Sequence, residues 1–508
     1  MRSPSRPRPR RRAVPRMTPR TLISGGPGLS AGSVRADAVA SLVVFLVALP
    51  LCVGVAVASG VPPELGLITG IVGGLVAGLL PGSSLQVSGP AAGLTVLVYE
   101  AVRAYGLPAL GVLVLAAGVV QLGLGALRQG RWFRAISVAV VQGMLAGIGL
   151  VLMAGQVYVL ADATAPGDGL GNLRGLPKLV RETLGSAEAV TAVAVGVGTV
   201  LVLVGWARWR AVARVVPAPL VAVGLAAGVV WAWDLPVARI DVRGLAEAVQ
   251  PPGAADFALL AEVGALGTVL AFALIASAES LFSAAAVDRM HEGPRTEYDR
   301  ELMAQGAGNA VCGALGALPM TAVIVRSSAN VAAGARTRLS RVLHGVWLLA
   351  FVALLPGVLG LMPVAALAGV LIHAGWKLVP VRELGPLWRE HRGEAVVLVV
   401  TAGAIVATNL FEGVLLGLLL AVVKSAWETS HVHLEVAGEP PGEGDPLHVR
   451  VVGNATFLRL PRLLDQLSEL PSDRPVVLDV SGLRHMDPAC RDALEGHVSG
   501  SPESVVRR

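Results

Sequence analysis

The chain has 508 residues, of which 54% are apolar and 15% are charged, and its mean hydropathy is +0.68. Soluble domains carry about a quarter of charged residues, so this balance excludes an ordinary soluble protein and indicates a polytopic membrane protein. The 61 glycines and 33 prolines, against four tyrosines, are typical of closely packed and interrupted membrane helices. The three cysteines form no CxxC pair and no Cys/His cluster, which excludes a disulfide framework and a structural zinc site.

The net charge of +6 comes from the amino terminus, where the first twenty residues hold eight arginines and no acid. The rest of the chain has 33 basic and 35 acidic residues, a balance of −2, which argues against nucleic-acid binding. We expect residues 1–35 to be a basic, disordered cytoplasmic tail that anchors the topology or contacts lipid headgroups. The first apolar run begins near Ala36 and is long enough to span a bilayer, unlike a cleavable signal peptide.

Apolar segments alternate with short polar loops along the chain and predict fourteen transmembrane segments. They lie at 36–59, 65–80, 86–101, 108–127, 135–159, 189–206, 216–233, 263–286, 302–317, 320–333, 340–357, 361–376, 395–410 and 412–426. Three arginine clusters fall in loops on the side of the amino terminus and therefore place both termini in the cytoplasm. These clusters are Arg128, Arg131 and Arg134; Arg208, Arg210 and Arg214; and Arg336, Arg338 and Arg341.

The segments divide into two sets of seven, at 36–233 and 263–426, joined by an extracytoplasmic linker at 234–262. An odd number of segments in each set gives the two halves opposite orientations. This is the inverted-repeat plan of many secondary transporters, which bind substrate near mid-membrane between discontinuous helices of the two halves.

The third segment of each half is interrupted by proline, in LPGSSLQVSGP for the first half and GALPMTA for the second. Ser88 and Thr321 are good N-caps, so each break is expected to start a half-helix at membrane depth. Two such N-termini facing one cavity offer unpaired N–H groups and a partial positive charge, which attract a small anion. The alternative is that the prolines only kink two ordinary spanning helices.

Ionisable residues inside the spans are few, and two of them are candidates for function. Glu279 is the only charge between Val263 and Val287, and with Ser283 one turn further it could hold a sodium ion or share a proton. The alternative is a protonated carboxyl that serves structure alone. Arg326 lies inside the second half-helix, where it either attracts an anion or braces the helix against carbonyl groups.

The carboxyl-terminal region loses the membrane pattern. Residues 440–499 predict a small α/β cytoplasmic domain, with strands at 447–457 and 475–480 and helices at 459–470 and 487–497.

From about Arg35 to His497 the chain resembles a bacterial member of the SulP (sulfate permease) family of inorganic anion transporters. The stretches that carry the resemblance are LPLCVGVAVASGVPPELGL, LQVSGPAAGLTVLV, ASAESLFSAAAVDRM and GALPMTAVIVRSSANVAAGARTRLS. The final stretch, VVLDVSGLRHMDPACRDALEGHV, is similar to part of a STAS domain, although Ala489 stands where soluble STAS switches carry a phosphorylatable serine. The family implies an all-α membrane fold of fourteen helices in a seven-plus-seven inverted repeat, a core and a gate domain, and a homodimer.

The resemblance also implies where the ligands bind. In the bicarbonate-transporting members the coupling sodium ion meets an acid and a hydroxyl on the eighth helix, which correspond to Glu279 and Ser283. The anion meets the starts of the third and tenth helices. The substrate-binding residues expected here are Gln86, Ser88, Ala91, Ala92, Thr321, Ala322, Val323 and Arg326. The sodium-coupled relatives have Asp at the position of Glu279, and they have a hydroxyl residue near the position of Ala91, which this chain lacks there. The resemblance therefore leaves open which ion is coupled and which anion is carried.

We therefore expect a secondary transporter in the inner membrane that moves sulfate or bicarbonate by alternating access, coupled to sodium or protons. We expect no other cofactor and no enzymatic activity, because no nucleophile or metal constellation is present. The alternatives are an uncoupled anion channel, a dicarboxylate permease, or a nucleobase permease of the same fold. A nucleobase permease should place an acid on the tenth helix where this chain has Arg326.

Overall fold

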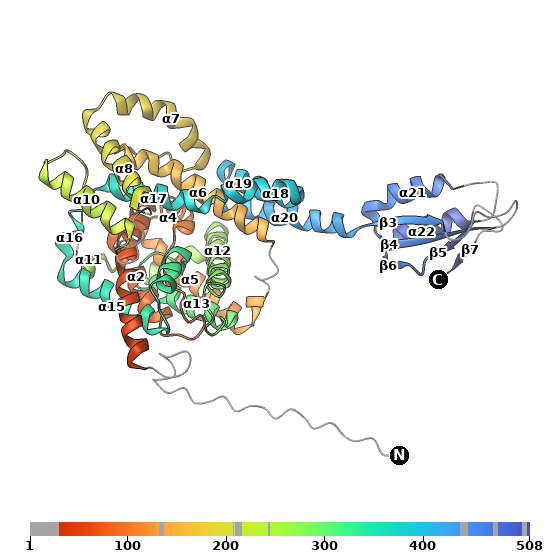
Figure 1. Ribbon diagram of the computed structural model, residues 1–508, viewed down its shortest axis with the longest axis horizontal. Helices are drawn as coiled ribbons and strands as arrows, with labels where there is room; N and C mark the ends of the chain where they lie inside the picture. Colours follow the sequence, from red (N-terminus) through yellow and green to blue (C-terminus); the bar gives the residue numbers. More distant parts are fainter. Residues whose placement is uncertain are drawn as a thin grey trace, which may run out of the picture.

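The computed structural model describes residues 30–131, 137–206, 208, 216–241, 244–436, 446–470, 476–499 and 505–507. A bundle of helices makes up most of the molecule, and its last helix leads into a small α/β unit (Figure 1). The expected basic tail lies almost entirely outside the described residues. The first helix begins at Ala31 rather than Ala36, so the last residues assigned to the tail are helical.

The first half contains one long helix for most of its predicted segments. Its elements are α2 (Ala31–Ala58), α3 (Pro63–Val72) with a π-helical turn (Gly73–Ala77), β1 (Ser88–Pro90), a 3-10 turn (Ala92–Leu94) leading into α4 (Thr95–Tyr105), α5 (Leu107–Ala126), α6 (Val138–Leu160), α7 (Gly169–Leu184), α8 (Ala187–Trp206) and α10 (Ala218–Ala232). The sequence did not predict α7. Its apolar residues are spaced for one helix face only, and that face packs against α6, α8 and α19.

The second half follows a connection that contains the short helix α11 (Leu245–Ala248) and a 3-10 helix (Ala254–Ala261). Its elements are α12 (Val263–Val287), α13 (Tyr298–Ala314), β2 (Met320–Ala322), α14 (Ile324–Ala332), α15 (Leu339–Leu354), α16 (Pro356–Leu359), α17 (Val364–Leu378), α18 (Val381–Glu390), α19 (Arg392–Ala407) and α20 (Leu410–Thr429). Each of the fourteen predicted segments therefore coincides with a helix or with a strand that leads into one.

The helices have the length and composition of membrane spans. Within the described residues, six helices and the stretch Val364–Glu390, which contains α17 and α18, reach at least 18 residues with the apolar character needed to cross a bilayer. Shorter apolar helices at Pro63–Ala77, Ala218–Ala232 and Leu339–Leu354 supplement them. The fold is a polytopic membrane fold, as the sequence predicted.

Each predicted segment of the first half corresponds, in chain order, to one of the second half. The contacts between helices stay the same when each helix is replaced by its counterpart, as expected for an inverted repeat. The pair α5 with α13 has its counterpart in α15 with α3, and the pair α19 with α6 has its counterpart in α8 with α17. The pairs β1 with β2 and α6 with α17 map onto themselves. Two groups of helices result. We call α2, α3, α4, α5, α12, α13, α14 and α15 the core group, and α6, α8, α10, α17, α19 and α20 the gate group.

The largest hydrophobic cluster lies inside the core group and reaches α6 and α17 of the gate group. Its fully buried members include Val55 on α2, Leu94 before α4 and Ile148 on α6, which are 3%, 1% and 2% exposed. The contact between core and gate around these three residues is therefore apolar.

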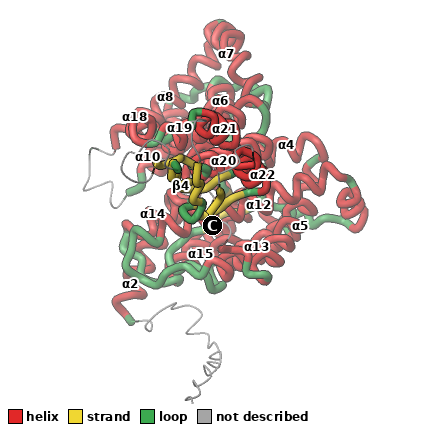
Figure 2. Tube along the Cα trace, turned by 90° about the vertical axis from the view of Figure 1, so that its right-hand side faces the viewer, coloured by secondary structure: helices red, strands yellow, loops and turns green. Residues whose placement is uncertain are grey.

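The carboxyl-terminal unit begins at Val432, before the predicted boundary at 440. Its elements are β3 (Val432–Val436), β4 (Leu447–Ala455), α21 (Leu460–Ser468), β5 (Val476–Asp479), β6 (Leu483–Met486), α22 (Pro488–Ser499) and β7 (Val505–Arg507). The strands form one sheet in the order β3-β4-β5-β7, with β6 also paired to β4, and Figure 2 shows this sheet beside α21 and α22. The two predicted strands and two predicted helices are present, and β3, β6 and β7 are additional.

Candidate functional site

The two proline-interrupted segments meet as a pair of short strands. β1 and β2 pair antiparallel, with Ser88 opposite Ala322, Gly89 opposite Thr321 and Pro90 opposite Met320. Just beyond the pair, the Val323 N–H donates to the Val87 carbonyl at 2.9 Å. Extended backbone in a membrane must find hydrogen-bond partners within the protein, and here each break supplies them to the other.

This pairing corrects the prediction that Ser88 and Thr321 are N-caps. Both residues are strand residues, and the half-helices begin later, at Ala92 after the first break and at Ile324 after the second. The Ser88 hydroxyl instead accepts a hydrogen bond from Gln305 Nε2 at 2.7 Å. The helix starts at Ala91 and Val323 have no side-chain cap, so the first-turn N–H groups stay available.

Polar side chains from the second half make hydrogen bonds to the backbone of β2 and to the residues just before β1. Asn309 on α13 accepts from the Met320 N–H at 2.7 Å and donates to the Met320 carbonyl at 3.1 Å. Ser280 on α12 accepts from the Ala322 N–H at 3.2 Å. Ser327 on α14 accepts from the Val87 N–H at 2.9 Å, and Asn330 donates to the Leu85 carbonyl at 2.9 Å. The breaks are therefore held rigidly.

A cavity of about 90 Å³ lies beside the strand pair, between the core and gate groups. The core side contributes Pro90, Ala92, Gly93, Glu279, Ser283, Val323 and Arg326, and the gate side contributes Val141, Met144 and Leu145 of α6 with Ala374 and Leu378 of α17. Larger grooves of about 390 and 440 Å³ are lined almost entirely by apolar side chains and lie along α10. The small cavity is the candidate site because charged groups line it.

The carboxylate of Glu279 lies in this cavity against the start of the first half-helix. A Cβ at Gly93 would lie 2.6 Å from Glu279 Oε1, so only glycine leaves room for the carboxylate there. Glu279 Oε2 is buried and has no hydrogen-bond partner among the described residues, and the Thr321 hydroxyl faces the same carboxyl. Ser283, one turn further on α12, lines the cavity and is 1% exposed. These oxygens could hold a proton or a cation.

Arg326 is 1% exposed and lies against the first strand. Its Nη2 donates to the Pro90 carbonyl at 3.3 Å, and a Cβ at Gly89 would overlap its Nη1. Its Nε and Nη1 are buried and have no partner among the described residues. Arg326 therefore makes the bracing contact and also keeps two donor nitrogens free, so both predicted roles have a structural basis.

Five of the ten predicted site residues line the cavity, namely Ala92, Glu279, Ser283, Val323 and Arg326. The other five are buried in and around the strand pair and do not line it, namely Gln86, Ser88, Ala91, Thr321 and Ala322. The Gln86 side chain donates to the Ser280 carbonyl at 2.8 Å and thereby fixes the first break to α12.

A second buried charge cluster was missed by the sequence analysis. Glu301 on α13 is fully buried and accepts from the Ser83 N–H at 2.7 Å and from Gln305 at 2.7 Å. Arg341 on α15, predicted to be a loop charge, is 1% exposed and donates to the Ala77 and Ser83 carbonyls. The signal was available, because Glu301 and Arg341 lie next to apolar segments and within helical reach of them.

The candidate cation site consists of one carboxylate and neighbouring hydroxyls. Across the described ranges, no group of three His, Cys, Asp or Glu residues converges on a point that could hold a metal ion. A sodium ion beside Glu279 would therefore complete its shell from hydroxyls, carbonyls and water, and a proton would need the carboxyl alone.

The fold and the cavity together define a polytopic transport protein built as an inverted repeat. The sequence profile of the family described as "Sulfate permease family" matches residues 34–401, and the chain belongs to this family. It is a permease and not an enzyme, as the sequence predicted.

Relatives in other organisms carry transporter names. The chain is 28% identical over 410 residues to the putative sulfate transporter YvdB of Bacillus subtilis (strain 168), a match that covers 78% of this chain and 74% of that protein. It is 26% identical over 371 residues to the bicarbonate transporter BicA of Picosynechococcus sp., covering 68% of this chain and 62% of that protein.

Solved structures share the fold. The transmembrane domain of a cyanobacterium bicarbonate transporter BicA superposes with a TM-score of 0.65 at 22% identity and covers 78% of this chain and 98% of that chain. The murine Slc26a9 anion transporter in the inward-facing state superposes with a TM-score of 0.77 at 14% identity and covers 94% of this chain and 86% of that chain.

Proposed function

We propose that the chain is a secondary transporter of a small inorganic oxyanion, sulfate or bicarbonate, that works by alternating access and is coupled to protons or sodium. One observation carries this proposal. A cavity between core and gate holds a guanidinium with two free donor nitrogens and a carboxylate with a free oxygen, next to two uncapped half-helix starts.

The arrangement suits an oxyanion for electrostatic reasons. Backbone N–H groups in the first turn of α14 and the free donors of Arg326 can replace the water that the anion loses on entering the membrane. Glu279 and Arg326 form no ion pair within 4 Å among the described residues, so the guanidinium is free to bind a ligand. A carboxylate near an anion repels it unless a proton or a cation is bound, which supplies a physical basis for coupling.

The walls of the cavity support alternating access. One wall belongs to the core group and the other to α6 and α17 of the gate group, so a displacement of core against gate would open the cavity to one side at a time. The names of the relatives support a small anion as cargo, and sulfate and bicarbonate are the two candidates that those names give.

The cellular arrangement follows from charge and exposed surface. We place the protein in the inner membrane as a multi-pass protein, with both termini in the cytoplasm and basic residues such as Arg128 and Arg336 on that side. Apolar side chains on α20, including Leu415, Leu419 and Val422, are about half exposed and would face lipid or a second copy in a homodimer.

Radiolabelled uptake into proteoliposomes tests the proposal. We expect uptake of sulfate or bicarbonate that a sodium or pH gradient drives above equilibrium. Flux that dissipates an anion gradient and never exceeds equilibrium would identify a channel, and uptake of dicarboxylates or nucleobases alone would identify another permease. Either result would overturn the proposal.

A further inference from the structure

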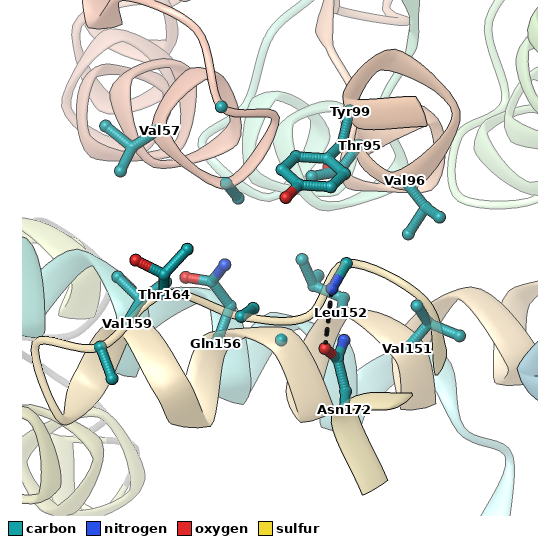
Figure 3. Close-up of a pocket in the computed structure, with 16 residues that line it drawn as sticks. Val57, Thr95, Val96, Tyr99, Val151, Leu152, Gln156, Val159, Thr164 and Asn172 are labelled. Atoms are coloured by element: carbon teal, nitrogen blue, oxygen red, sulfur yellow. Dashed lines mark hydrogen bonds between the residues drawn. The ribbon is translucent and has the colours of Figure 1, made fainter. Parts of the chain in front are cut away.

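A second cavity lies on the same interface between core and gate, at the carboxyl-terminal ends of α2 and α6, which the predicted topology places outside the cytoplasm. Figure 3 shows side chains that line this cavity. Its volume is about 210 Å³, and it is lined by the end of α2, the first two turns of α4, the second half of α6 and the loop 163–167. Thr164 lines it and is exposed, so the cavity opens to the surface there. With water occupying about 30 Å³ per molecule, it has room for a small oxyanion and part of its hydration shell.

The two cavities are arranged in series along the same three elements. On α2, Leu51 and Val55 line the inner cavity, whereas Val57 and Ala58 line the outer one. On α6, the inner cavity meets residues 141–145 and the outer one residues 151–159. On the first half-helix, Ala92 and Gly93 are followed by Thr95, Val96 and Tyr99 in the same order.

An apolar constriction separates them. Val55 lines the outer end of the inner cavity, and Leu94 and Ile148 lie between the residues that line the two cavities. All three are buried in the same hydrophobic cluster. Such a barrier excludes water and hydrated ions until the walls move apart, so an anion that reaches the outer cavity stops there.

The outer cavity offers uncharged hydrogen-bond donors that lack partners. Gln156 is 4% exposed, and its amide points into the cavity with no hydrogen-bond partner among the described residues (Figure 3). The Thr95 hydroxyl is also buried without a partner. Asn172 accepts from the Gly167 N–H at 3.1 Å through Oδ1, which leaves its Nδ2 group as a donor. A buried hydroxyl without a partner is costly, so a ligand that accepts a hydrogen bond from Thr95 would remove this cost, and the amides of Gln156 and Asn172 offer it further donors.

The lining of the cavity carries no negative charge, because none of its lining residues is acidic. At its rim, Arg103 on α4 donates to the Pro166 carbonyl of the covering loop at 3.2 Å and places a positive charge at the entrance. Asp162 and Asp168 flank that loop and are exposed to solvent, which screens their repulsion.

We propose that this outer cavity is a second anion site, at which Gln156, Thr95 and Asn172 hold an oxyanion on the extracytoplasmic side before it passes the Val55–Leu94–Ile148 constriction. The inference rests on the proposed function, because it takes a small oxyanion as cargo and places the outer ends of the helices outside the cytoplasm.

Cysteine accessibility tests the site without depending on transport rates. The native cysteines Cys52, Cys312 and Cys490 are all buried, so they give little background. Gln156→Cys should react with a membrane-impermeant thiol reagent added from outside, and saturating sulfate or bicarbonate should slow that reaction at least threefold. Gln142→Cys is the matched control. It replaces the same residue type on the same helix, about 21 Å nearer the cytoplasm at 1.5 Å per residue, and should react only from inside.

A second variant measures affinity. Gln156→Glu keeps the size of the side chain and adds a negative charge to a poorly hydrated site, so it should raise the KM of anion uptake by about tenfold. Absence of labelling from outside, labelling that neither anion slows, or an unchanged KM in Gln156→Glu would each overturn the outer site. If wild-type uptake of either anion persists in these cases, the proposed function stands. If the wild type transports neither anion, both proposals fall.

Discussion

The two half-helix breaks both form a short strand followed by a helix start, but they differ in the side chains that they place at the site. The first break is built from small residues, and its glycines lie where charged side chains need space. Gly89 lies under the Arg326 guanidinium and Gly93 under the Glu279 carboxylate. Both charges come from the second half of the chain, on α14 and α12. Both halves therefore contain one of the paired strands, but the first half provides the glycines that leave space and the second half provides the charged side chains.

The polar scaffold shows the same division. Asn309, Ser280, Ser327 and Asn330 all belong to the second half, and the last two reach backbone groups of the first break. The first half contributes fewer such contacts: Gln86 donates to the Ser280 carbonyl, Thr69 donates to the Leu318 carbonyl just before β2, and Gln121 accepts from Asn309. Substitutions in the second half should therefore change ligand chemistry, and substitutions in the first half should act by steric overlap.

The largest effect is expected for Glu279→Gln. The amide has the same shape but cannot exchange a proton or hold a cation as strongly, so uphill uptake should fall to the level of empty vesicles while the protein still folds. Gradient-driven uptake in proteoliposomes measures this, with Glu262→Gln at the exposed start of α12 as the control. Uphill uptake at the wild-type rate in Glu279→Gln would remove the coupling role.

Arg326→Ala should raise the KM for the anion by about tenfold or more, the usual loss for a hydrogen bond to a charged group. Arg336→Ala is the control, since that side chain is exposed and only its backbone N–H contacts Asp37. The KM is compared with the yield of monodisperse protein. An unchanged KM together with a large loss of folded protein would show that Arg326 only braces β1.

Much of this arrangement was predictable, and the remainder depends on tertiary pairing. Long apolar runs predicted all fourteen segments. The lone charge at Glu279 and the prolines around Ser88 indicated where the site would lie. The strands β1 and β2 have only three residues each, too few for an alternating pattern, so Ser88 and Thr321 looked like N-caps. Their true conformation depends on pairing across more than two hundred residues, which no local signal encodes.

The space in the first break can be tested by filling it. Gly93→Ala places a methyl group 2.6 Å from Glu279 Oε1 and should displace the carboxylate, lowering kcat/KM for the anion by about tenfold at a typical overpacking cost of 1–3 kcal/mol. Gly123→Ala on α5 is the matched control, because a Cβ there meets nothing within 4 Å. Equal kinetics for the two alanine variants would show that the cavity accommodates the methyl group and that room in the first break is not limiting.

The smallest effect is expected far from both breaks, at the carboxyl-terminal unit. This unit meets the membrane region at the end of α20, where Arg459 lies 4.2 Å over the ring of Trp427 and Asn454 donates to the Thr429 carbonyl at 2.9 Å. Removing the residues after Ser430 leaves the strand pair and the cavity intact, so calorimetric binding of sulfate and bicarbonate should stay within about twofold of the full chain.

The same deletion should weaken self-association, because β3 and β7 are the outermost strands in the described part of the carboxyl-terminal sheet, and a second copy could pair with such edges. Light-scattering mass, measured on the same samples as the calorimetry, should therefore show a less stable dimer with intact binding. A truncated protein that is folded and monodisperse but no longer binds either anion would place the carboxyl-terminal unit in the transport mechanism. The two breaks would then not be sufficient to make the site.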